Sequence, residues 1–335
     1  MIDLADVFRA RQRIAPYVRR TPLTPSAWLS DLSATAFGAH ASVSLKLESL
    51  QVSSSFKSRG AFNAVIARLE RREPPGRLVT ASAGNHGRAL AAAAETFKLP
   101  LVVFTPADAP HAKVAAISRH GAELRAEGRD YDDAERLAIA FASETGAEFI
   151  SPYNDADVIA GAATIALEIA EDAPGTNTMI VPIGGGGLIS GVALAARAID
   201  PGIEIVGVEA EVSCAFQTSV RAGRLVTIVP GHTLADGLGG NPDPETITFG
   251  FIQRLVDRIV TVAEDDLAAA IAGLVEWEHL VAEGAGAAGV AALISRGGPR
   301  VDVTGRRVAI IVSGSNIDRA RLAPLLAGDR LTRTS

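Results

Sequence analysis

Short apolar runs alternate with segments of helical spacing along most of the chain, and this alternation restricts the fold more than any other feature. A helix between two successive strands favours parallel pairing of those strands, so we expect an α/β protein built on parallel sheets. The runs typical of strands lie at 43–47, 78–81, 100–104, 148–150, 178–183, 203–209, 258–262 and 307–312. The segments with helical spacing lie at 3–15, 57–72, 88–98, 112–120, 131–145, 155–170, 188–199, 264–280, 284–296 and 317–327. Residues 210–250, which contain many Gly and Pro, give no clear prediction.

Composition and charge exclude several classes of protein. Hydrophobic residues make up 48% of the chain but aromatic residues only 5%, as is typical of sheets covered by helices on both faces. The net charge of −6 is not gathered into runs of one sign, which argues against a nucleic-acid-binding protein. No apolar run approaches about 18 residues, no secretory signal is visible, and the single cysteine, Cys214, excludes an internal disulfide. We therefore expect a cytoplasmic protein that binds neither membranes nor nucleic acid.

The stretch at 53–60 places one lysine, Lys57, at the junction between a predicted strand and a predicted helix. The positive end of a helix dipole lowers the pKa of a nearby ammonium group, and an amine with a lowered pKa readily forms a Schiff base. The alternative is a solvated lysine at the start of a helix, and the residues around Lys57 do not decide between the two by themselves.

Four consecutive glycines at 184–187 connect a buried strand to a helix. Without Cβ atoms, their backbone amides can approach an anion at the positive end of the helix, which predicts a phosphate-binding site. A tight turn is the simplest alternative, but a turn does not need four glycines. A nicotinamide-dependent oxidoreductase is another, because Gly185, Gly187 and Gly191 loosely resemble a dinucleotide fingerprint and Glu209 follows about twenty residues on.

Two further polar loops follow predicted strands. The loop at 82–87 offers backbone amides to a carboxylate, together with the side chains of Asn85 and His86, and Ser313 follows the last strand. The alternatives are a structural hydrogen bond for His86 and a helix cap for Ser313. Because ligands bind at the carboxyl ends of parallel strands, we expect these residues to share one site with Lys57. A lysine, a phosphate cradle and a neutral partner for a ring nitrogen predict pyridoxal 5′-phosphate, and the neutral partner favours β-elimination over transamination.

Several motifs, spread over most of the chain, stand in the order found in a known enzyme family. They lie at 45–48, 55–61 (Ser-Phe-Lys-Ser-Arg-Gly-Ala), 82–87 (Ser-Ala-Gly-Asn-His-Gly), 158–161, 164–169, 182–191, 207–209, 235–237, 283–287 and 313–316. On these motifs the chain resembles the fold type II, or β-family, pyridoxal-phosphate enzymes, in the branch of threonine/serine dehydratases and serine racemases. Residues 11–16 and 235–238 also resemble dehydratases of hydroxyectoine utilisation.

The resemblance implies a role for each candidate site residue. Lys57 is the Schiff-base lysine and the general base at Cα, while Phe56 packs near the cofactor ring. Asn85 bonds the ring hydroxyl, and Ser313 faces the pyridine nitrogen. The phosphate is held by Gly184, Gly185, Gly186, Gly187 and the amide of Leu188. The substrate carboxylate is received by Ser82, Ala83, Gly84, Asn85 and His86.

The resemblance also implies an architecture and a reaction. We expect two open parallel-sheet α/β domains with the cofactor in the cleft between them. A small, mobile domain spans 49–151, and a large cofactor-binding domain combines 1–48 with 152–335. We expect a homodimeric ammonia-lyase that converts a hydroxy amino acid, L-threonine or L-serine, to a 2-oxo acid and ammonia by β-elimination. A 3-hydroxyaspartate or hydroxyectoine-derived substrate, serine racemisation and a non-catalytic binding protein are the alternatives.

The chain departs from the family pattern at several positions. Serine racemases have a serine where this chain has Ala83, so we expect elimination rather than racemisation. Many relatives bind a divalent cation near the residue that matches Glu209, but the position expected for a second acidic ligand is Ala215, so we predict no metal site. The chain also lacks room for the C-terminal regulatory domain of biosynthetic threonine dehydratases, so we do not expect feedback by isoleucine.

Overall fold

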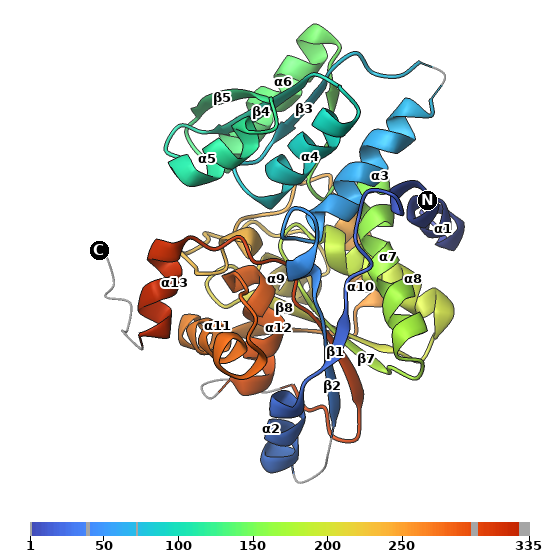
Figure 1. Ribbon diagram of the computed structural model, residues 1–335, viewed down its shortest axis with the longest axis vertical. Coiled ribbons are helices and arrows are strands. Elements are labelled where there is room, and N and C mark those ends of the chain that lie inside the picture. The colour runs from blue at the N-terminus through green and yellow to red at the C-terminus, as the bar shows by residue number, and fades with distance from the viewer. Residues whose placement is uncertain (1, 38–40, 72, 296–300, 328–335) are drawn as a thin grey trace.

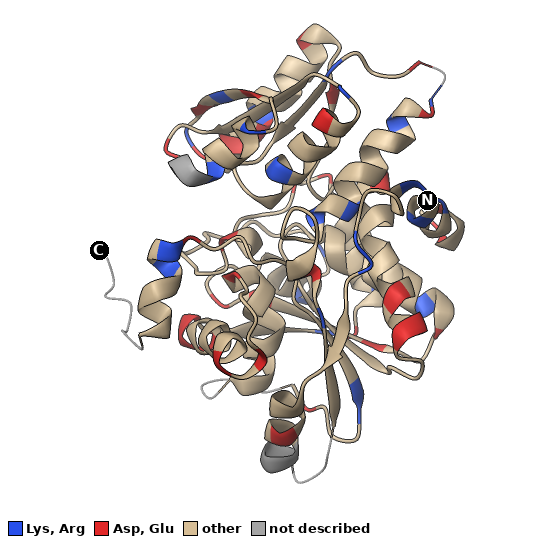
Figure 2. Cartoon of the chain, viewed as in Figure 1, with Lys and Arg blue, Asp and Glu red and all other residues tan. Residues whose placement is uncertain are grey.

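In the computed structural model, the chain folds into two α/β domains, each built on its own sheet (Figure 1). The structure describes all residues except 1, 38–40, 72, 296–300 and 328–335. Charged residues of both signs are spread over the two domains (Figure 2). None of the helices described is long and apolar enough to cross a membrane.

The larger sheet has six strands in the order β1-β2-β10-β7-β8-β9. Their bounds are β1 Leu23–Pro25, β2 Ser42–Lys46, β7 Thr178–Pro182, β8 Glu204–Ala210, β9 Arg258–Val262 and β10 Arg307–Ile311. Neighbouring strands are parallel except for β1, which pairs antiparallel with β2 at the sheet edge. The central strand β7 is buried along its whole length, as expected of a parallel strand covered on both faces.

The smaller sheet has four parallel strands in the order β5-β4-β3-β6. Their bounds are β3 Leu78–Ala81, β4 Leu101–Pro106, β5 Glu123–Gly128 and β6 Glu148–Phe149. Strand β5 is absent from the sequence-based prediction, because its charged residues hide the apolar pattern. It pairs only with β4 and lies mostly accessible at the sheet edge, where charged side chains are tolerated.

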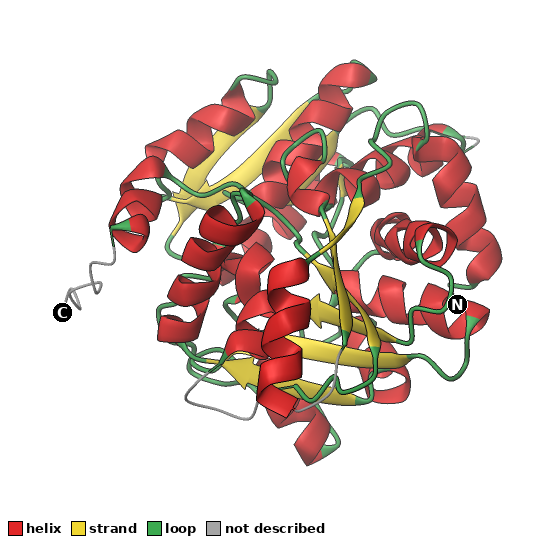
Figure 3. Cartoon of the chain, turned by 60° about the horizontal axis from the view of Figure 1, so that its bottom comes forward, coloured by secondary structure: helices red, strands yellow, loops and turns green. Residues whose placement is uncertain are grey.

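Helices cover both faces of each sheet (Figure 3). Their bounds are α1 Leu4–Ile14, α2 Ala27–Phe37, α3 Lys57–Leu69, α4 Asn85–Thr96, α5 His111–Ser118, α6 Tyr131–Thr145, α7 Ala156–Asp172, α8 Gly187–Ile199, α9 Ala215–Ala222, α10 Thr248–Leu255, α11 Glu264–Glu278, α12 Gly284–Ile294 and α13 Arg319–Leu326. On the larger sheet, α7 and α8 pack on one face and α11 and α12 on the other. On the smaller sheet, α3 and α4 pack on one face and α6 on the other.

The structure adds three helices to those that the sequence predicts, namely α2, α9 and α10. Helix α9 lies in the Gly- and Pro-rich stretch at 210–250, and α10 begins at the end of that stretch. Neither helix has a periodicity long enough to stand out in the sequence. Helix α4 begins at Asn85 instead of 88, so Asn85, His86 and Gly87 form a helical first turn. This shift matters for the site, because the amides of a first helical turn have no partner within the helix.

Candidate active site

Lys57 begins helix α3, where the loop that leads into this helix runs beside the loop that follows β10. The amide of Phe56 donates to the carbonyl of Ser313 at 3.0 Å, and the amide of Ser315 donates to the carbonyl of Ser54 at 2.9 Å. The backbone pairing therefore brings Lys57 and Ser313 together, although they lie far apart in the sequence.

The ammonium group of Lys57 has few polar neighbours. Its Nζ donates to the carbonyl oxygen of Pro152 at 2.8 Å and lies 5.1 Å from the centre of the Phe56 ring. Burial lowers the pKa of Lys57 to about 8, although the negative charge of Glu283 acts in the opposite direction. At pH 7 roughly one Lys57 amine in ten is therefore neutral, which is the nucleophilic form and far more than for a lysine with an unshifted pKa.

A buried ionic cluster fixes α3 just behind Lys57. The guanidinium of Arg59, which is 1% exposed, binds both oxygens of Glu48 at 2.8 Å. It also binds both oxygens of Glu168, at 2.7 and 2.9 Å. The ammonium of Lys46 completes the cluster by donating to Glu168 at 2.6 Å. Two cations and two carboxylates thus neutralise one another beneath the site, which the sequence analysis did not foresee.

The four glycines connect β7 to the first turn of α8. Among the described residues, none accepts a hydrogen bond from the amides at 185–188, so these four N–H groups are free to bind an anion. A Cβ on Gly185 would stand 2.3 Å from the ring of Tyr153, and Gly186 has a φ of 86°. Glycine is therefore needed at both positions, for close packing at the first and for a left-handed backbone at the second. Tyr153 follows Pro152, the partner of Lys57, so the cradle lies next to the lysine.

The loop at 82–87 surrounds the start of α4. The hydroxyl of Ser82 accepts from the amide of Gly84 at 3.2 Å, and a Cβ on Gly87 would meet the carbonyl of Ser82 at 2.4 Å. Within the described part of the chain, the amides of Asn85 and His86 have no acceptor, so this helix terminus can bind a carboxylate.

The ring of His86 is buried, and its environment does not suit a general acid or base. Its Nε2 lies 3.3 Å from the carbonyl of Ile150. Burial lowers the pKa of His86 to about 3, and the Lys57 ammonium acts in the same direction. The ring is neutral at physiological pH, which favours the structural alternative for this side chain.

The side chain of Asn85 is held between two residues that the sequence analysis left without a role. Its Nδ2 donates to Glu283 Oε1 at 2.6 Å, and its Oδ1 accepts from Asn316 Nδ2 at 2.7 Å. Burial raises the pKa of Glu283 to about 7, and Asp236 adds to this, while Asn85, Lys113 and Lys57 oppose it. The only sequence signal for Glu283 and Asn316 was their position in the motifs at 283–287 and 313–316.

The two domains also contact one another directly around this site. Lys113 of α5 forms an ion pair with Asp236 of the larger domain, and Arg88 Nη1 donates to Asn316 Oδ1 at 2.5 Å. A small pocket between the domains is lined by Lys113, Asp236, Glu283 and Asn316. The candidate residues therefore surround a cleft to which both domains contribute side chains.

The side chain of Ser313 is well placed to bond a ligand. It is only 3% exposed, and no residue described by the structure forms a hydrogen bond with its hydroxyl. An accessible hydroxyl with no partner in the protein is free to bond a ligand. The amine of Lys57, the free amides at 185–188 and this hydroxyl together fit the aldehyde, the phosphate and the ring nitrogen of pyridoxal 5′-phosphate.

The carboxylate of Glu209 accepts hydrogen bonds from the backbone of the protein. It accepts from the amides of Phe216 and Gln217, each at 2.8 Å, and so caps the start of α9. Burial raises the pKa of Glu209 to about 7, while these two amides act against the rise. Over the described residues, no group of three or more His, Cys, Asp or Glu is placed to hold a metal ion.

Two parallel-sheet domains with this set of groups between them define a fold type II pyridoxal-phosphate enzyme. The family model described as pyridoxal-phosphate dependent enzyme matches residues 14–314, and the chain belongs to this family.

Among known proteins, similar chains include an L-threonine ammonia-lyase of Thermotoga maritima, 41% identical over 95% of this chain and 76% of that protein. An L-threo-3-hydroxyaspartate ammonia-lyase of Saccharomyces cerevisiae is 38% identical over 96% of each chain. The solved structure of maize serine racemase is 33% identical and covers 98% of this chain and 97% of its own, with a TM-score of 0.88.

Proposed function

We propose that this protein is a pyridoxal-phosphate-dependent ammonia-lyase that converts a small hydroxy amino acid, L-threonine or L-serine, to a 2-oxo acid and ammonia. The observation that carries the proposal is the amine of Lys57, whose lowered pKa and position beside the free amides at 185–188 suit both a covalent link and proton transfer. Relatives named as L-threonine ammonia-lyases and threonine dehydratases support the reaction class.

Each group of the site has a part in this reaction. When bound, the cofactor withdraws electrons from the Cα of the amino acid joined to it, and so acidifies the Cα proton. The amides of Asn85 and His86 bind the substrate carboxylate and orient the Cα–H bond toward Lys57. The amine of Lys57 takes the Cα proton, and the β-hydroxyl takes up one proton and leaves as water. The released enamine tautomerises to an imine, which one water molecule hydrolyses to the 2-oxo acid and ammonia. The neutral Ser313 hydroxyl bonds the ring nitrogen without supplying a proton, which favours rapid elimination over transamination.

Racemisation is the second candidate, because the maize serine racemase is similar to this chain over nearly its whole length. A racemase needs a proton donor on the face of Cα opposite Lys57. The chain has Ala83 in the carboxylate loop, and a methyl group cannot donate a proton. We therefore place elimination first, and a chiral assay separates the two reactions.

The test of the proposal is the release of 2-oxo acid from L-threonine, L-serine, D-serine and both 3-hydroxyaspartate diastereomers, with chiral analysis of the remaining substrate. We expect rapid 2-oxobutyrate formation from L-threonine and no build-up of D-allothreonine, the product of inversion at Cα. Inversion of serine at a rate above that of elimination would overturn the proposal in favour of a racemase. Turnover of a 3-hydroxyaspartate alone would keep the reaction and change the substrate, and hydroxyectoine-derived compounds are the next to assay if none of these reacts.

Glu283 is expected to set the pH at which Lys57 reacts. Its charge raises the pKa of Lys57, so the Glu283→Gln variant should lower that pKa below about 8. The rate at which the apoenzyme takes up cofactor covalently rises as the amine deprotonates, so the midpoint of its pH profile should move to lower pH. The matched control is Glu211→Gln, at an exposed position that has no part in the proposed reaction. An unchanged midpoint in Glu283→Gln would contradict this electrostatic role.

The remaining expectations concern organisation and location. We propose 49–151 as the small domain and 1–48 with 152–335 as the large one, because the four-stranded sheet and α4 to α6 all fall in the first range. We also propose a homodimer, on the family resemblance. A cytoplasmic location is proposed because the one cysteine, Cys214, is free.

A further inference from the structure

Two carboxylates face the cleft without a cation of the protein beside them. Glu135 lies on the second turn of α6 in the small domain, and Asp243 lies in the loop before α10 in the large domain; both are half-buried. The arginines nearest to Glu135 in the sequence, Arg129 and Arg136, pair with Asp133 instead. Among the described residues, no lysine or arginine forms an ion pair with Glu135 or Asp243, and we call these two residues the acidic pair.

Neutral groups hold the acidic pair in place. Glu135 Oε1 accepts from the hydroxyl of Tyr131 at 3.3 Å. The two oxygens of Asp243 accept from the amide of Glu245 at 2.8 Å and from Asn154 Nδ2 at 3.1 Å. Burial raises the pKa of Glu135 to about 7; the Tyr131 hydroxyl opposes the rise, and the negative charge of Asp243 adds to it. The two carboxylates therefore repel one another, and a cation between them would stabilise both.

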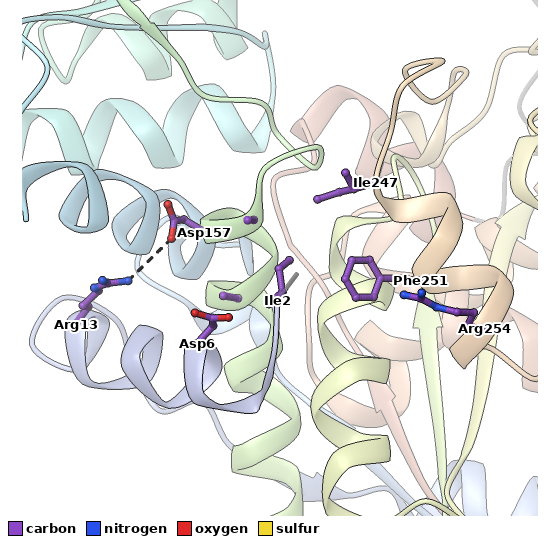
Figure 4. A pocket seen from close by; sticks show the side chains of 9 residues that line it. Ile2, Asp6, Arg13, Asp157, Ile247, Phe251 and Arg254 are labelled. Carbon is purple, nitrogen blue, oxygen red and sulfur yellow. Dashed lines mark ion pairs between the residues drawn. The ribbon is translucent and has the colours of Figure 1, made fainter. Parts of the chain in front are cut away.

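In the cavity where α1, α7 and α10 meet, by contrast, the carboxylates are already paired. Arg13 of α1 forms an ion pair with Asp157 of α7, with 4.0 Å between Nη1 and Oδ1 (Figure 4). A second arginine, Arg9, pairs with Asp6. Both aspartates of that cavity thus have a cation of the protein beside them, whereas in the described part of the chain neither member of the acidic pair does.

Tyr153 places the acidic pair beside the reacting groups. The residue before it accepts from Lys57 Nζ at 2.8 Å through its carbonyl, and the ring of Tyr153 packs against Gly185 of the phosphate-binding loop. The Tyr153 hydroxyl accepts from the amide of Asp243 at 2.9 Å. Burial raises the pKa of Tyr153, and the negative charges of Glu135 and Asp243 add to the rise. One side chain therefore connects the acidic pair with both Lys57 and the phosphate site.

The groups that mark this cleft as a ligand site are independent of the acidic pair. Tyr153 is only 7% exposed, and the proton of its hydroxyl has no acceptor among the residues that the structure describes. The hydroxyl of Ser313 and the amides at 185–188 are likewise free within that part of the chain. A phosphate bound at those amides adds negative charge near the acidic pair, so a cation becomes more favourable there. No group of three or more acidic, His or Cys side chains among the described residues is placed to hold a metal ion, so an organic ammonium is the cation that fits.

We propose that Glu135 and Asp243 select a 3-hydroxy amino acid whose side chain carries an ammonium group, with 2,4-diamino-3-hydroxybutanoate as the simplest example. This inference rests on the proposed ammonia-lyase function. The substrate carboxylate binds at the first turn of α4 and the Cα–H bond faces Lys57, so the side chain is directed to the remaining wall, where Tyr153 and the acidic pair lie. L-Threonine presents a methyl group to this wall and remains a substrate, whereas 3-hydroxyaspartate presents a carboxylate, which the acidic pair repels.

The reaction of such a substrate balances as it does for L-threonine. The Cα proton is removed, and the β-hydroxyl takes up one proton and leaves as water. The enamine tautomerises to an imine, and one water molecule hydrolyses the imine to 4-amino-2-oxobutanoate and ammonia. The ammonium on Cγ forms and breaks no bond, and no oxidant or reductant is needed.

The first test compares three substrates that differ only at C4, namely 2,4-diamino-3-hydroxybutanoate, L-threonine and 3-hydroxyaspartate. It is run at about pH 8, where most of the Glu135 carboxyl is ionised. We expect kcat/KM for 2-oxo acid release to be about tenfold or more higher for the ammonium substrate than for L-threonine, because charge-assisted hydrogen bonds are strong. We expect 3-hydroxyaspartate to be the poorest of the three. A kcat/KM for L-threonine or 3-hydroxyaspartate that equals or exceeds that of the ammonium substrate would overturn the proposal.

The variants Glu135→Gln and Asp243→Asn each remove one charge and keep the shape of the side chain. In each, the ratio of kcat/KM for the ammonium substrate to that for L-threonine should fall about tenfold, and 3-hydroxyaspartate should gain relative to L-threonine. The matched control is Glu144→Gln, at an exposed position near the end of the same helix, which should keep the parent ratio. A ratio of two substrates on one sample does not depend on how much of the protein is folded, so a merely structural role would leave it unchanged. Parent ratios in both variants would reject the proposal.

A binding measurement separates this proposal from the proposed function. The probes 2,4-diaminobutanoate, 2-aminobutanoate and aspartate carry the same three groups at C4 but have no hydroxyl to eliminate. Each is titrated into the holoenzyme and followed by the change in visible absorbance when an amino acid joins the cofactor. We expect 2,4-diaminobutanoate to bind about tenfold more tightly than 2-aminobutanoate and aspartate to bind most weakly, and we expect Glu135→Gln to reduce the first difference.

The two readouts distinguish the ways in which the inference can fail. The expected order of binding in an enzyme that eliminates no hydroxy amino acid would keep the selectivity of the acidic pair and reject only the ammonia-lyase function. Release of 2-oxo acid from L-threonine without that order of binding would keep the function and reject the selectivity.

Discussion

Replacement of Lys57 by alanine should lower the rate of 2-oxo acid release by about three orders of magnitude or more. The amine has two parts in the proposed reaction, as the covalent anchor of the cofactor and as the base at Cα, and alanine can perform neither. Lys57→Ala should also lose the visible absorbance of the lysine-bound cofactor. The free amides at 185–188 remain in this variant, so we expect it to retain weak, non-covalent cofactor binding.

The measurement that isolates Lys57 is borohydride reduction followed by mass spectrometry of the intact chain. The parent protein should carry one added cofactor mass, and Lys57→Ala should carry none. Lys98→Ala, which removes a lysine at a turn after α4, is the matched control and should behave like the parent protein. A cofactor mass that stays on the Lys57→Ala chain would assign the covalent link to another lysine and reject the site as described.

The fold could be predicted from the sequence, and a topological rule explains why the candidate residues were expected at one edge of a sheet. In a parallel sheet, every strand ends at the same edge, so polar or glycine-rich residues after different strands must lie near one another. Lys57, the glycines at 184–187 and Ser313 could therefore be joined into one site before their distances were known. The backbone hydrogen bond between Phe56 and Ser313 agrees with that expectation, because it joins the residue before Lys57 to the loop after the last strand.

The residues that support the site were harder to predict, because their partners lie far away in the chain. Glu283 orients Asn85 from 198 positions away, and Arg59 binds Glu168 from 109 positions away. A single sequence gives no pairing signal for such contacts, and a carboxylate on its own is more often solvated than buried. Strand β5 was missed because charged residues alternate along it and interrupt the apolar pattern. An edge strand tolerates such residues, since one of its sides is open to solvent.

The Arg59 cluster leads to the second large effect, which concerns stability. We expect Arg59→Met to lower the free energy of unfolding by about 3–5 kcal/mol, because it leaves Glu48 and Glu168 buried with only Lys46 to balance them. The measurement is the midpoint of urea unfolding. Arg71→Met removes a surface pair with Glu148 and should cost about 1 kcal/mol or less.

The acid side of the stability profile tests the same cluster independently. Burial alone would raise the pKa of Glu48, but Arg59 holds that pKa below its usual value. A carboxyl with a lowered pKa in the folded protein adds stability above its unfolded pKa, and this stability is lost as the pH falls through the folded value. The parent protein should therefore lose this contribution only below about pH 4.5.

In Arg59→Met the carboxyl of Glu48 has lost its main partner, so burial should raise its pKa and the variant should become less stable as the pH rises from 4.5 toward neutrality. The double variant Glu48→Gln with Arg59→Met removes the unbalanced charge and should recover part of the loss. A flat response of Arg59→Met between those pH values, together with a cost no larger than that of Arg71→Met, would show that the cluster does not hold α3 in place. A large loss of stability with the expected pH dependence would instead show that the cluster holds α3 in place. Lys57 lies two residues before Arg59 on that helix, so the position of the reactive amine would then depend on the cluster.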